Sequence, residues 1–148
     1  NPPMARKISL ALGEFYHLYN RGTEKRNIFK TREDYQRFLL LAYLCNSPRH
    51  IHIADLIPRG STSWNFEKLL NEERYATLVD VGAYCLMPNH FHLILREKEE
   101  GGISRFMQKV ATGYTMYFNT KYERSGALFQ GKYKAEHAGQ IHQAAQFL

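Results

Sequence analysis

The feature that most limits the possible folds of this chain is a pair of apolar runs separated by a short turn. The runs span residues 78–86 and 91–95, and both are rich in the β-branched and aromatic residues that suit strands. Met87, Pro88 and Asn89 stand between the two runs and supply the chemistry of a turn. The stretch therefore predicts a β-hairpin.

The second strand of this hairpin begins with a His-Phe-His triplet. Side chains alternate between the two faces of a strand, so His90 and His92 point the same way, about 7 Å apart, and Phe91 points the opposite way. Two imidazoles at this spacing suit a metal ion, although paired histidines are also common as ordinary hydrogen-bonded side chains. His50 and His52 form a second such triplet. We favour the first triplet because it begins a strongly apolar strand behind a turn, where a buried scaffold can hold a site rigidly.

Length and composition indicate one soluble domain with an anionic partner. A chain of 148 residues can bury a core without the help of disulfides or metal ions, and a hydrophobic share of 44% excludes disorder of the whole chain. No apolar run approaches the roughly 20 residues of a membrane-spanning helix, and the first residues lack the apolar segment of a signal peptide. We therefore expect a soluble, cytoplasmic protein. Its formal charge of +6 points to a polyanionic partner.

The first part of the chain reads as a strand, a basic loop and a helix. The strand is predicted over residues 15–20, and the loop over 21–32 carries Arg21, Lys25 and Arg26. This loop suits the gripping of phosphates, and a merely solvated charged loop has the same composition.

The helix after this loop is predicted by a start signal and by its apolar spacing. Thr31 stands three residues before Asp34, as in a capping box, and the apolar face runs to about Asn46. The apolar spacing is lost over residues 47–76, which contain Pro and Ser breaks and one short helix near residues 66–70. We interpret 47–76 as an insertion between the first helix and the second strand.

The remaining chain predicts a long helix and a last strand. Apolar residues keep to helical spacing over 103–122, with Gly113 as the one weak point. A loop then leads into a strand that carries Lys132 and Lys134 on one face. The two cysteines, Cys45 and Cys85, lie in apolar settings and are expected to be free, buried thiols.

The order strand, helix, strand, strand, helix, strand predicts an α+β fold of the ferredoxin-like split βαβ type. This fold is a four-stranded antiparallel sheet with helices on one face. Its first and third strands are central. The third strand is the one that begins with the histidine pair.

Four stretches together resemble the single-tyrosine HUH transposases, and most closely their REP-associated tyrosine transposase branch. The stretches are YHLYNRGTEKRNIF (16–29), AYCLMPNHFHLIL (83–95), ISRFMQKVATGYTMYFN (103–119) and GALFQGKYKAEHA (126–138). The resemblance implies that residues 1–148 are a single domain of this kind, interrupted by the insertion. It implies a metal-dependent enzyme that binds hairpin-forming single-stranded DNA, then cleaves and rejoins it through a 5′-phosphotyrosine.

The resemblance also implies a set of ligands and partners. His90 and His92 correspond to the pair that binds a divalent metal, Mg²⁺ or Mn²⁺, and an oxygen ligand from elsewhere would complete a site for such hard ions. No small-molecule cofactor is implied. The DNA partner would be a hairpin such as a repetitive extragenic palindrome, and a homodimer is possible because many members of the family are dimeric.

The catalytic tyrosine of this family lies on a helix after the last strand. Its spacing, roughly twenty residues on from Gln130, reaches the end of the chain, and residues 140–148 contain no tyrosine. We therefore expect the nucleophile just beyond Leu148. A catalytically inactive member, or use of another tyrosine, are the alternatives. Packing explains Tyr114, Tyr117 and Tyr133 better, and Glu136, His137 and His142 are weaker candidates to approach the metal.

Contacts with DNA are assigned to the basic side chains of the first loop and of the last strand. These residues are Arg21, Lys25, Arg26, Lys132 and Lys134. Tyr19, Phe29 and Phe129 offer rings on which unpaired bases could stack, and the same rings would also serve as core residues.

Two other functions compete with strand transfer. One is a basic binding module for structured single-stranded nucleic acid that does not cut it. The other is a relative of replication initiators or relaxases, which we rank last because those proteins often carry a third histidine in the motif.

Overall fold

The computed structural model describes residues 9–50, 66–71, 74 and 76–139. In chain order the elements are β1 (Phe15–Arg21), the single turn η1 (Thr23–Lys25), α1 (Arg32–Leu44), α3 (Phe66–Leu70), β2 (Val79–Met87), β3 (His90–Glu97), α4 (Gly102–Lys121) and β4 (Lys134–His137). The predicted hairpin, first strand and two long helices are confirmed, each within two residues of its expected bounds. The last strand begins later than predicted, so Lys132 precedes it.

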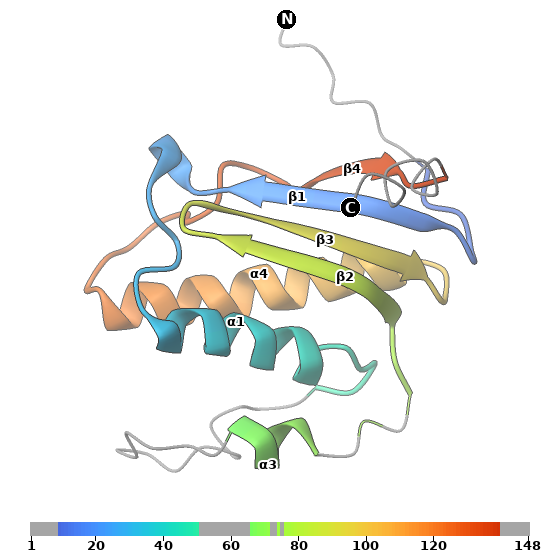
Figure 1. The fold of residues 1–148 in the computed structure, drawn as a ribbon, viewed down its shortest axis with the longest axis horizontal. Helices are drawn as coiled ribbons and strands as arrows, with labels where there is room; N and C mark the ends of the chain where they lie inside the picture. Colours follow the sequence, from blue (N-terminus) through green and yellow to red (C-terminus); the bar gives the residue numbers. More distant parts are fainter. Residues whose placement is uncertain (1–8, 51–65, 72–73, 75, 140–148) are drawn as a thin grey trace, which may run out of the picture.

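The four strands form one antiparallel sheet in the order β2-β3-β1-β4. Helices α1 and α4 cover one face of this sheet (Figure 1). The predicted α+β fold is confirmed, with β1 and β3 in the centre. The opposite face, called the open face below, is covered by no helix within the described ranges.

Strand β3 divides its side chains between these two faces. Phe91, Leu93 and Leu95 are buried toward the helices, whereas His90 and His92 are half-buried on the open face. Each buried apolar side chain contributes about 1.5–3 kcal/mol relative to an exposed one. This burial fixes the face on which the histidines lie, because a shift of one residue in register would reverse every side chain.

The turn between β2 and β3 is fastened to the loop after β1. The Pro88 carbonyl accepts hydrogen bonds from the backbone N–H groups of Ile28 (2.8 Å) and Phe29 (3.0 Å). The Asn89 carbonyl accepts one from the N–H of Gly22 at 3.0 Å. The basic loop and the start of the histidine strand are therefore held together.

The core between sheet and helices is aromatic. Phe38 contacts Phe91 and Tyr114, with ring centroids 5.1 and 5.4 Å apart. Phe29 and Phe129 are also buried in this cluster. Of the two roles open to these rings, the structure gives them the role of core residues.

The two helices start and pack as their sequences require. Thr31 and Asp34 form the predicted capping box at the start of α1. In α4, a Cβ on Gly113 would stand 2.9 Å from Cδ2 of Leu41, a buried residue of α1. The weak point in the helical pattern therefore marks a place where α4 approaches a neighbouring side chain too closely for a larger residue.

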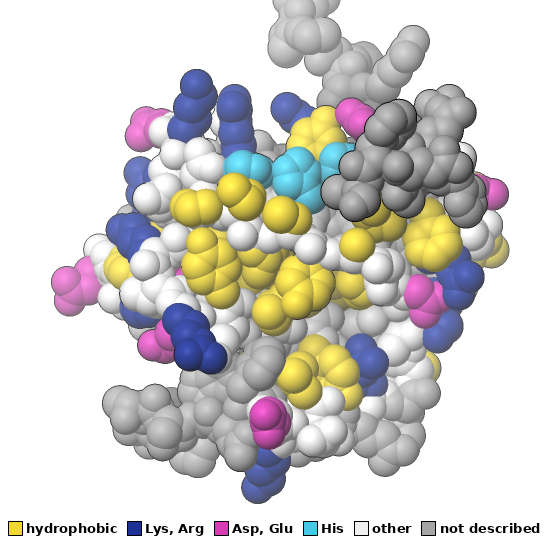
Figure 2. Space-filling view, in the orientation of Figure 1, with side chains coloured by type: hydrophobic (Ala, Val, Ile, Leu, Met, Phe, Trp, Pro, Cys, Tyr) yellow, Lys and Arg dark blue, Asp and Glu magenta, His cyan; other side chains and the backbone are white. Residues whose placement is uncertain are grey.

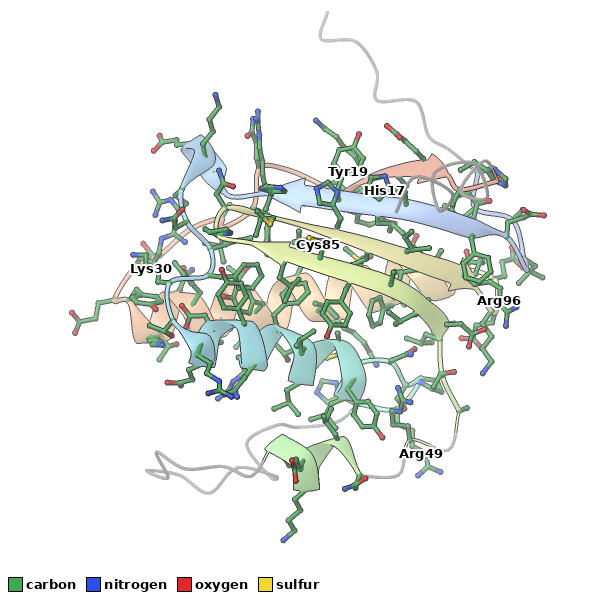
Figure 3. The ribbon with its side chains drawn as sticks, viewed as in Figure 1. His17, Tyr19, Lys30, Arg49, Cys85 and Arg96 are labelled. Atoms are coloured by element: carbon green, nitrogen blue, oxygen red, sulfur yellow. The ribbon has the colours of Figure 1, made fainter. Side chains whose placement is uncertain are left out.

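Some other predictions agree with the structure only in part or concern residues outside the described ranges. Cys45 and Cys85 are free thiols, as expected, but Cys45 is half-buried. Cys85 is exposed, since it pairs with His92 and so lies on the open face of the sheet; Figure 3 labels its position. The short helix predicted near residues 66–70 is α3, and most other residues of the predicted insertion over 47–76 lie outside the described residues. His52 and His142 also lie outside them. Within the described ranges, no helix is long and apolar enough to span a membrane.

Candidate functional site

The histidine pair of β3 presents two unengaged ring nitrogens on the open face. The rings of His90 and His92 are perpendicular, with centroids 5.1 Å apart. Nδ1 of His90 lies 2.7 Å from Oδ1 of Asn89, and Nδ1 of His92 lies 2.9 Å from Nε2 of His17. Among the described residues, neither Nε2 atom has a hydrogen-bond partner. Each imidazole is therefore held by one nitrogen and keeps the other available.

His17 is a site residue that the sequence reasoning missed. It lies on β1, where its Cα pairs with that of Ile94, and its ring reaches diagonally to His92, whose Cα pairs with Tyr19. Figure 3 shows His17 and Tyr19 together on β1. Only the register between β1 and β3 brings His17 and His92 together, and the residues of either strand alone do not fix that register.

The surroundings favour the neutral form of His92. Burial lowers the pKa of His92, and the neighbouring His17 and His90 lower it further, because a positive charge on either would repel a second one. A neutral imidazole retains a lone pair, which is the form that binds metal ions.

Tyr19 and Glu136 lie beside the three histidines, His17, His90 and His92, on the open face. The Tyr19 hydroxyl donates to Oε1 of Glu136 at 3.1 Å, and its ring centroid lies 6.0 Å from that of His92. The hydrogen bond to Glu136 raises the pKa of Tyr19, with burial and the carboxylate charge acting in the same direction. A phenol held in this way is a poor nucleophile, so the arrangement favours a binding role for its ring.

The donor set fits two ligands of a divalent ion. His90 and His92 supply two nitrogen donors, and the described residues contain no group of three or more His, Cys, Asp or Glu side chains placed to hold an ion. His137 does not join the pair: its Nε2 lies 2.9 Å from Oε2 of Glu14, and its ring packs edge-on against the buried Tyr16. A third His, Cys, Asp or Glu ligand would therefore have to come from outside the described residues.

The internal tyrosines are packing residues, as the apolar spacing predicts. Tyr114 is fully buried and donates to the carbonyl of Ile28, and burial raises its pKa far above the ordinary value. Tyr117 donates to Oδ1 of Asp34 at 2.9 Å, and burial also raises its pKa. These hydroxyls are committed to structural hydrogen bonds.

The basic residues of the first loop lie beside the start of β3. Arg21 pairs by Cα with His90 and donates from Nε to Oε1 of Gln130 at 2.6 Å. Lys25 is exposed and has a left-handed backbone with φ of 58°. Arg26 lies 3.9 Å from the carboxylate of Glu24. The predicted loop residues therefore flank the histidine pair, at the end of β3 where His90 stands.

The predicted lysines lie at and just before β4, the edge strand next to β1. Lys134 begins β4 and pairs by Cα with Tyr19, so the two side chains share the open face. Lys132 is exposed just before the strand. Figure 2 shows the histidines grouped together, with Lys and Arg side chains projecting beyond them. Arg21 on β1 and Lys134 on β4 therefore lie on the same side of the histidine pair, and β2 lies on its other side.

Comparison with known proteins identifies the family. Residues 16–146 match the family described as "Transposase IS200 like". Because this match spans most of the chain, the chain belongs to the IS200-like transposases, a family of enzymes that cleave and transfer DNA. The resemblance found in the four sequence stretches is confirmed at this level.

A solved structure with a similar fold agrees with this assignment. It is that of a REP-associated tyrosine transposase bound to a REP hairpin, with a TM-score of 0.54 and 10% sequence identity, covering 97% of this chain and 67% of that chain. At this identity the likeness shows the shared fold. The comparison with curated proteins gave no match.

Proposed function

We propose that this chain is the metal-binding and DNA-binding part of a single-stranded DNA transposase of the HUH class, from the REP-associated branch. The observation that carries the proposal is the pair of Nε2 atoms on the open face that have no hydrogen-bond partner among the described residues, with Arg21 beside His90 and Lys134 beside Tyr19. Membership of the IS200-like family supplies the reaction class. The similar fold of a hairpin-bound transposase supports hairpin DNA as the partner.

His90 and His92 would hold a divalent ion, Mg²⁺ or Mn²⁺, through their Nε2 atoms. Such an ion supplies positive charge at the scissile phosphate when it is bound. Because two imidazoles alone suit softer metals, an oxygen ligand from outside the described residues, or water, would complete a site for a hard ion. The part of this chain would be to hold each imidazole by its Nδ1 atom and to leave its Nε2 atom for the ion.

The nucleophile would be the catalytic tyrosine of the family. Its phenolate oxygen would attack the scissile phosphorus, forming a tyrosine–phosphorus ester as the bond to the 3′ oxygen breaks. The departing oxygen takes a proton and becomes a 3′-hydroxyl. The phosphodiester energy stays in the 5′-phosphotyrosine, so that rejoining to another 3′-hydroxyl needs no ATP.

DNA would lie across the open face between its two basic groups. Arg21, Lys25 and Arg26 would contact phosphates beside His90, and Lys132 and Lys134 would do so near β4. The Tyr19 ring stands between these groups and could stack on an unpaired base. Phosphate contacts of this kind position the strand and carry no sequence information themselves.

A homodimer is a further part of the proposal. Among the described residues, strand β4 is an edge of the sheet, and its outer backbone groups could extend the sheet of a second copy. Light scattering on the full-length protein tests this point, and a strict monomer would remove it.

Covalent capture tests the proposed reaction. The full-length product of the gene is incubated with a single-stranded hairpin and Mn²⁺, and the adduct is separated on a denaturing gel and mapped by mass spectrometry. We expect an adduct on a tyrosine, located by the mass spectrum, that disappears in His92→Ala.

The second candidate is a hairpin-binding protein that does not cut DNA. It is favoured by the described residues themselves, which offer two metal ligands and no tyrosine poised for attack. Retained hairpin binding with no adduct, under the same conditions, would support this candidate and reject strand transfer.

A further inference from the structure

We infer that His17 is a positioning residue that fixes the ring orientation and the tautomer of His92. This inference rests on the proposed metal site, because it concerns how one of its ligands is made ready. It goes beyond that site in assigning a role to a third imidazole, which comes from a different strand.

The contact between the two rings is an in-plane hydrogen bond. The ring planes are only 19° apart and the centroids are 5.1 Å apart, while Nε2 of His17 lies 2.9 Å from Nδ1 of His92. The two nitrogens therefore lie close to the line that joins the ring centres. The rings meet edge to edge, which is the geometry of an N–H group pointing at a lone pair.

This hydrogen bond can run in two directions, and only one of them suits metal binding. If His17 donates from Nε2, His92 must carry its own proton on Nε2, and that atom has no lone pair to offer. If His92 donates from Nδ1, its Nε2 lone pair is free and His17 carries its proton on Nδ1. A bound ion selects the second arrangement, in which His17 is the acceptor.

The other ligand is held in a matching way. Nδ1 of His90 lies 2.7 Å from Oδ1 of Asn89, an oxygen that can only accept. His90 must therefore carry its proton on Nδ1, which leaves its Nε2 free as well. Asn89 and His17 thus perform the same task for the two members of the pair, one from the turn and one from the neighbouring strand.

His17 is itself well placed to hold an orientation. It lies on the central strand β1, whose backbone is paired on both sides: His17 is opposite Ile94 on β3 and Glu136 on β4. The ring of Tyr19 lies 5.1 Å from its own ring on the same face. A partner fixed in this way orients a ligand more strictly than a mobile side chain would.

A direct ligand role for His17 is the competing explanation. Two imidazoles that bind one ion direct their lone pairs at the ion, whereas here the two nitrogens are directed at each other. The structure therefore favours the positioning role, and an experiment that counts bound nitrogens separates the two roles.

The test is Mn²⁺ binding by the full-length protein, followed by electron paramagnetic resonance without DNA. His17→Ala removes the acceptor, and we expect the dissociation constant to rise about 10–100-fold. His17→Gln and His17→Asn form a matched pair, because the Gln amide reaches the position of Nε2 and the shorter Asn amide does not. We expect Gln to retain wild-type affinity and Asn to behave like Ala. His137→Gln, a histidine bonded to Glu14, serves as the control and should not alter affinity.

The count of nitrogens coordinated to Mn²⁺, from pulsed resonance, gives the second readout. We expect two imidazoles in the wild type and two in His17→Gln. Three in the wild type and two in the variant would make His17 a ligand and overturn the positioning role. Wild-type affinity in both His17→Ala and His17→Asn would reject this role alone. Failure of the wild type to bind Mn²⁺ would reject the metal site and this role with it.

Discussion

Two polar clusters in this protein differ in whether their hydrogen-bonding capacity is used up. Around Asp34, which is fully buried, the carboxylate accepts bonds from Lys30 N (2.8 Å), Thr31 N (3.2 Å), Tyr117 Oη (2.9 Å), Lys121 Nζ (2.9 Å) and Tyr122 Oη (2.6 Å). On the open face, His90 and His92 each use one ring nitrogen and leave the other without a partner among the described residues.

The contrast distinguishes polar groups that stabilise the fold from polar groups that remain available to bind a ligand. A buried carboxylate must be saturated, because an unpaired buried charge costs several kcal/mol. The Asp34 cluster obeys this rule and ties the start of α1 to the end of α4. The half-buried imidazoles can leave a lone pair unused at little cost, and that lone pair is what a ligand needs. We therefore expect changes to the first cluster to alter stability and changes to the second to alter binding.

The largest effect is expected from Asp34→Ala, which leaves Lys121, Tyr117, Tyr122 and two backbone N–H groups without their acceptor. Removing one partner from a buried ion pair typically costs about 3–5 kcal/mol, and we expect a loss of that size in the free energy of unfolding. Urea unfolding followed by circular dichroism measures it.

The matched control is Glu33→Gln in the same helical turn. The Glu33 carboxylate is exposed and lies 3.6 Å from Lys121 Nζ. Exposed pairs contribute about 0–1 kcal/mol, so this variant should unfold almost as the wild type does. Equal losses in the two variants would show that the saturated cluster is not what stabilises the helix pair.

The next largest effect is expected from His92→Ala, and it should appear in activity. Loss of a metal ligand should slow adduct formation by the full-length protein at least about 100-fold, which corresponds to about 2.7 kcal/mol. The free energy of unfolding should change much less than in Asp34→Ala, since His92 is only half-buried. If His92→Ala unfolds easily but keeps its activity, His92 has a structural role, and the proposed difference between the two clusters is wrong.

The Asp34 cluster should also make stability depend on pH. Burial alone would raise the pKa of this carboxyl, but hydrogen bonds from Tyr122, Lys121 and Tyr117, and from the backbone of Lys30, lower it to about 2 from an ordinary 3.8. A lowered folded-state pKa stabilises the protein above the unfolded value. The contribution, roughly 2 kcal/mol, should be complete above pH 3.8 and be lost as the pH falls through about 2.

Acid titration of the unfolding free energy measures this dependence. Asp34→Asn has no carboxyl at this position, so its stability should fall less steeply over the same pH interval than that of the wild type. An identical acid slope in both proteins would assign the pH dependence to other carboxyls.

The smallest effect is expected from single phosphate contacts on the open face. Lys25→Ala should weaken hairpin binding and reduce the slope of log affinity against log salt by about 1. Lys98→Ala is the control: it removes the same charge at the other end of β3, where Nζ donates to Oγ1 of Thr77 at 2.8 Å. Fluorescence anisotropy over a salt series measures both. Equal slopes for the two variants would remove the loop from the DNA-binding surface.

Much of the fold could be predicted because its signals are local. The capping box at Thr31 and Asp34, the turn at Pro88, and the apolar periods of strand and helix each depend on residues close together in the chain. The alternation within β3 placed His90 and His92 on one face for the same reason. The exposed Cys85 was predicted wrongly, since an apolar strand does not reveal which of its two faces no other element covers.

The sequence by itself therefore determined the elements, their order and the histidine pair, because period and turn chemistry are properties of neighbouring residues. The tertiary structure alone decided what stands beside the pair. His17 is separated from His92 by 75 positions, and the antiparallel register of β1 against β3 brings their ring nitrogens to 2.9 Å. The tertiary structure also decided that Phe29 and Phe129 are buried in the core. From the sequence alone these rings could equally have stacked on DNA, since the burial of a side chain depends on what packs against it.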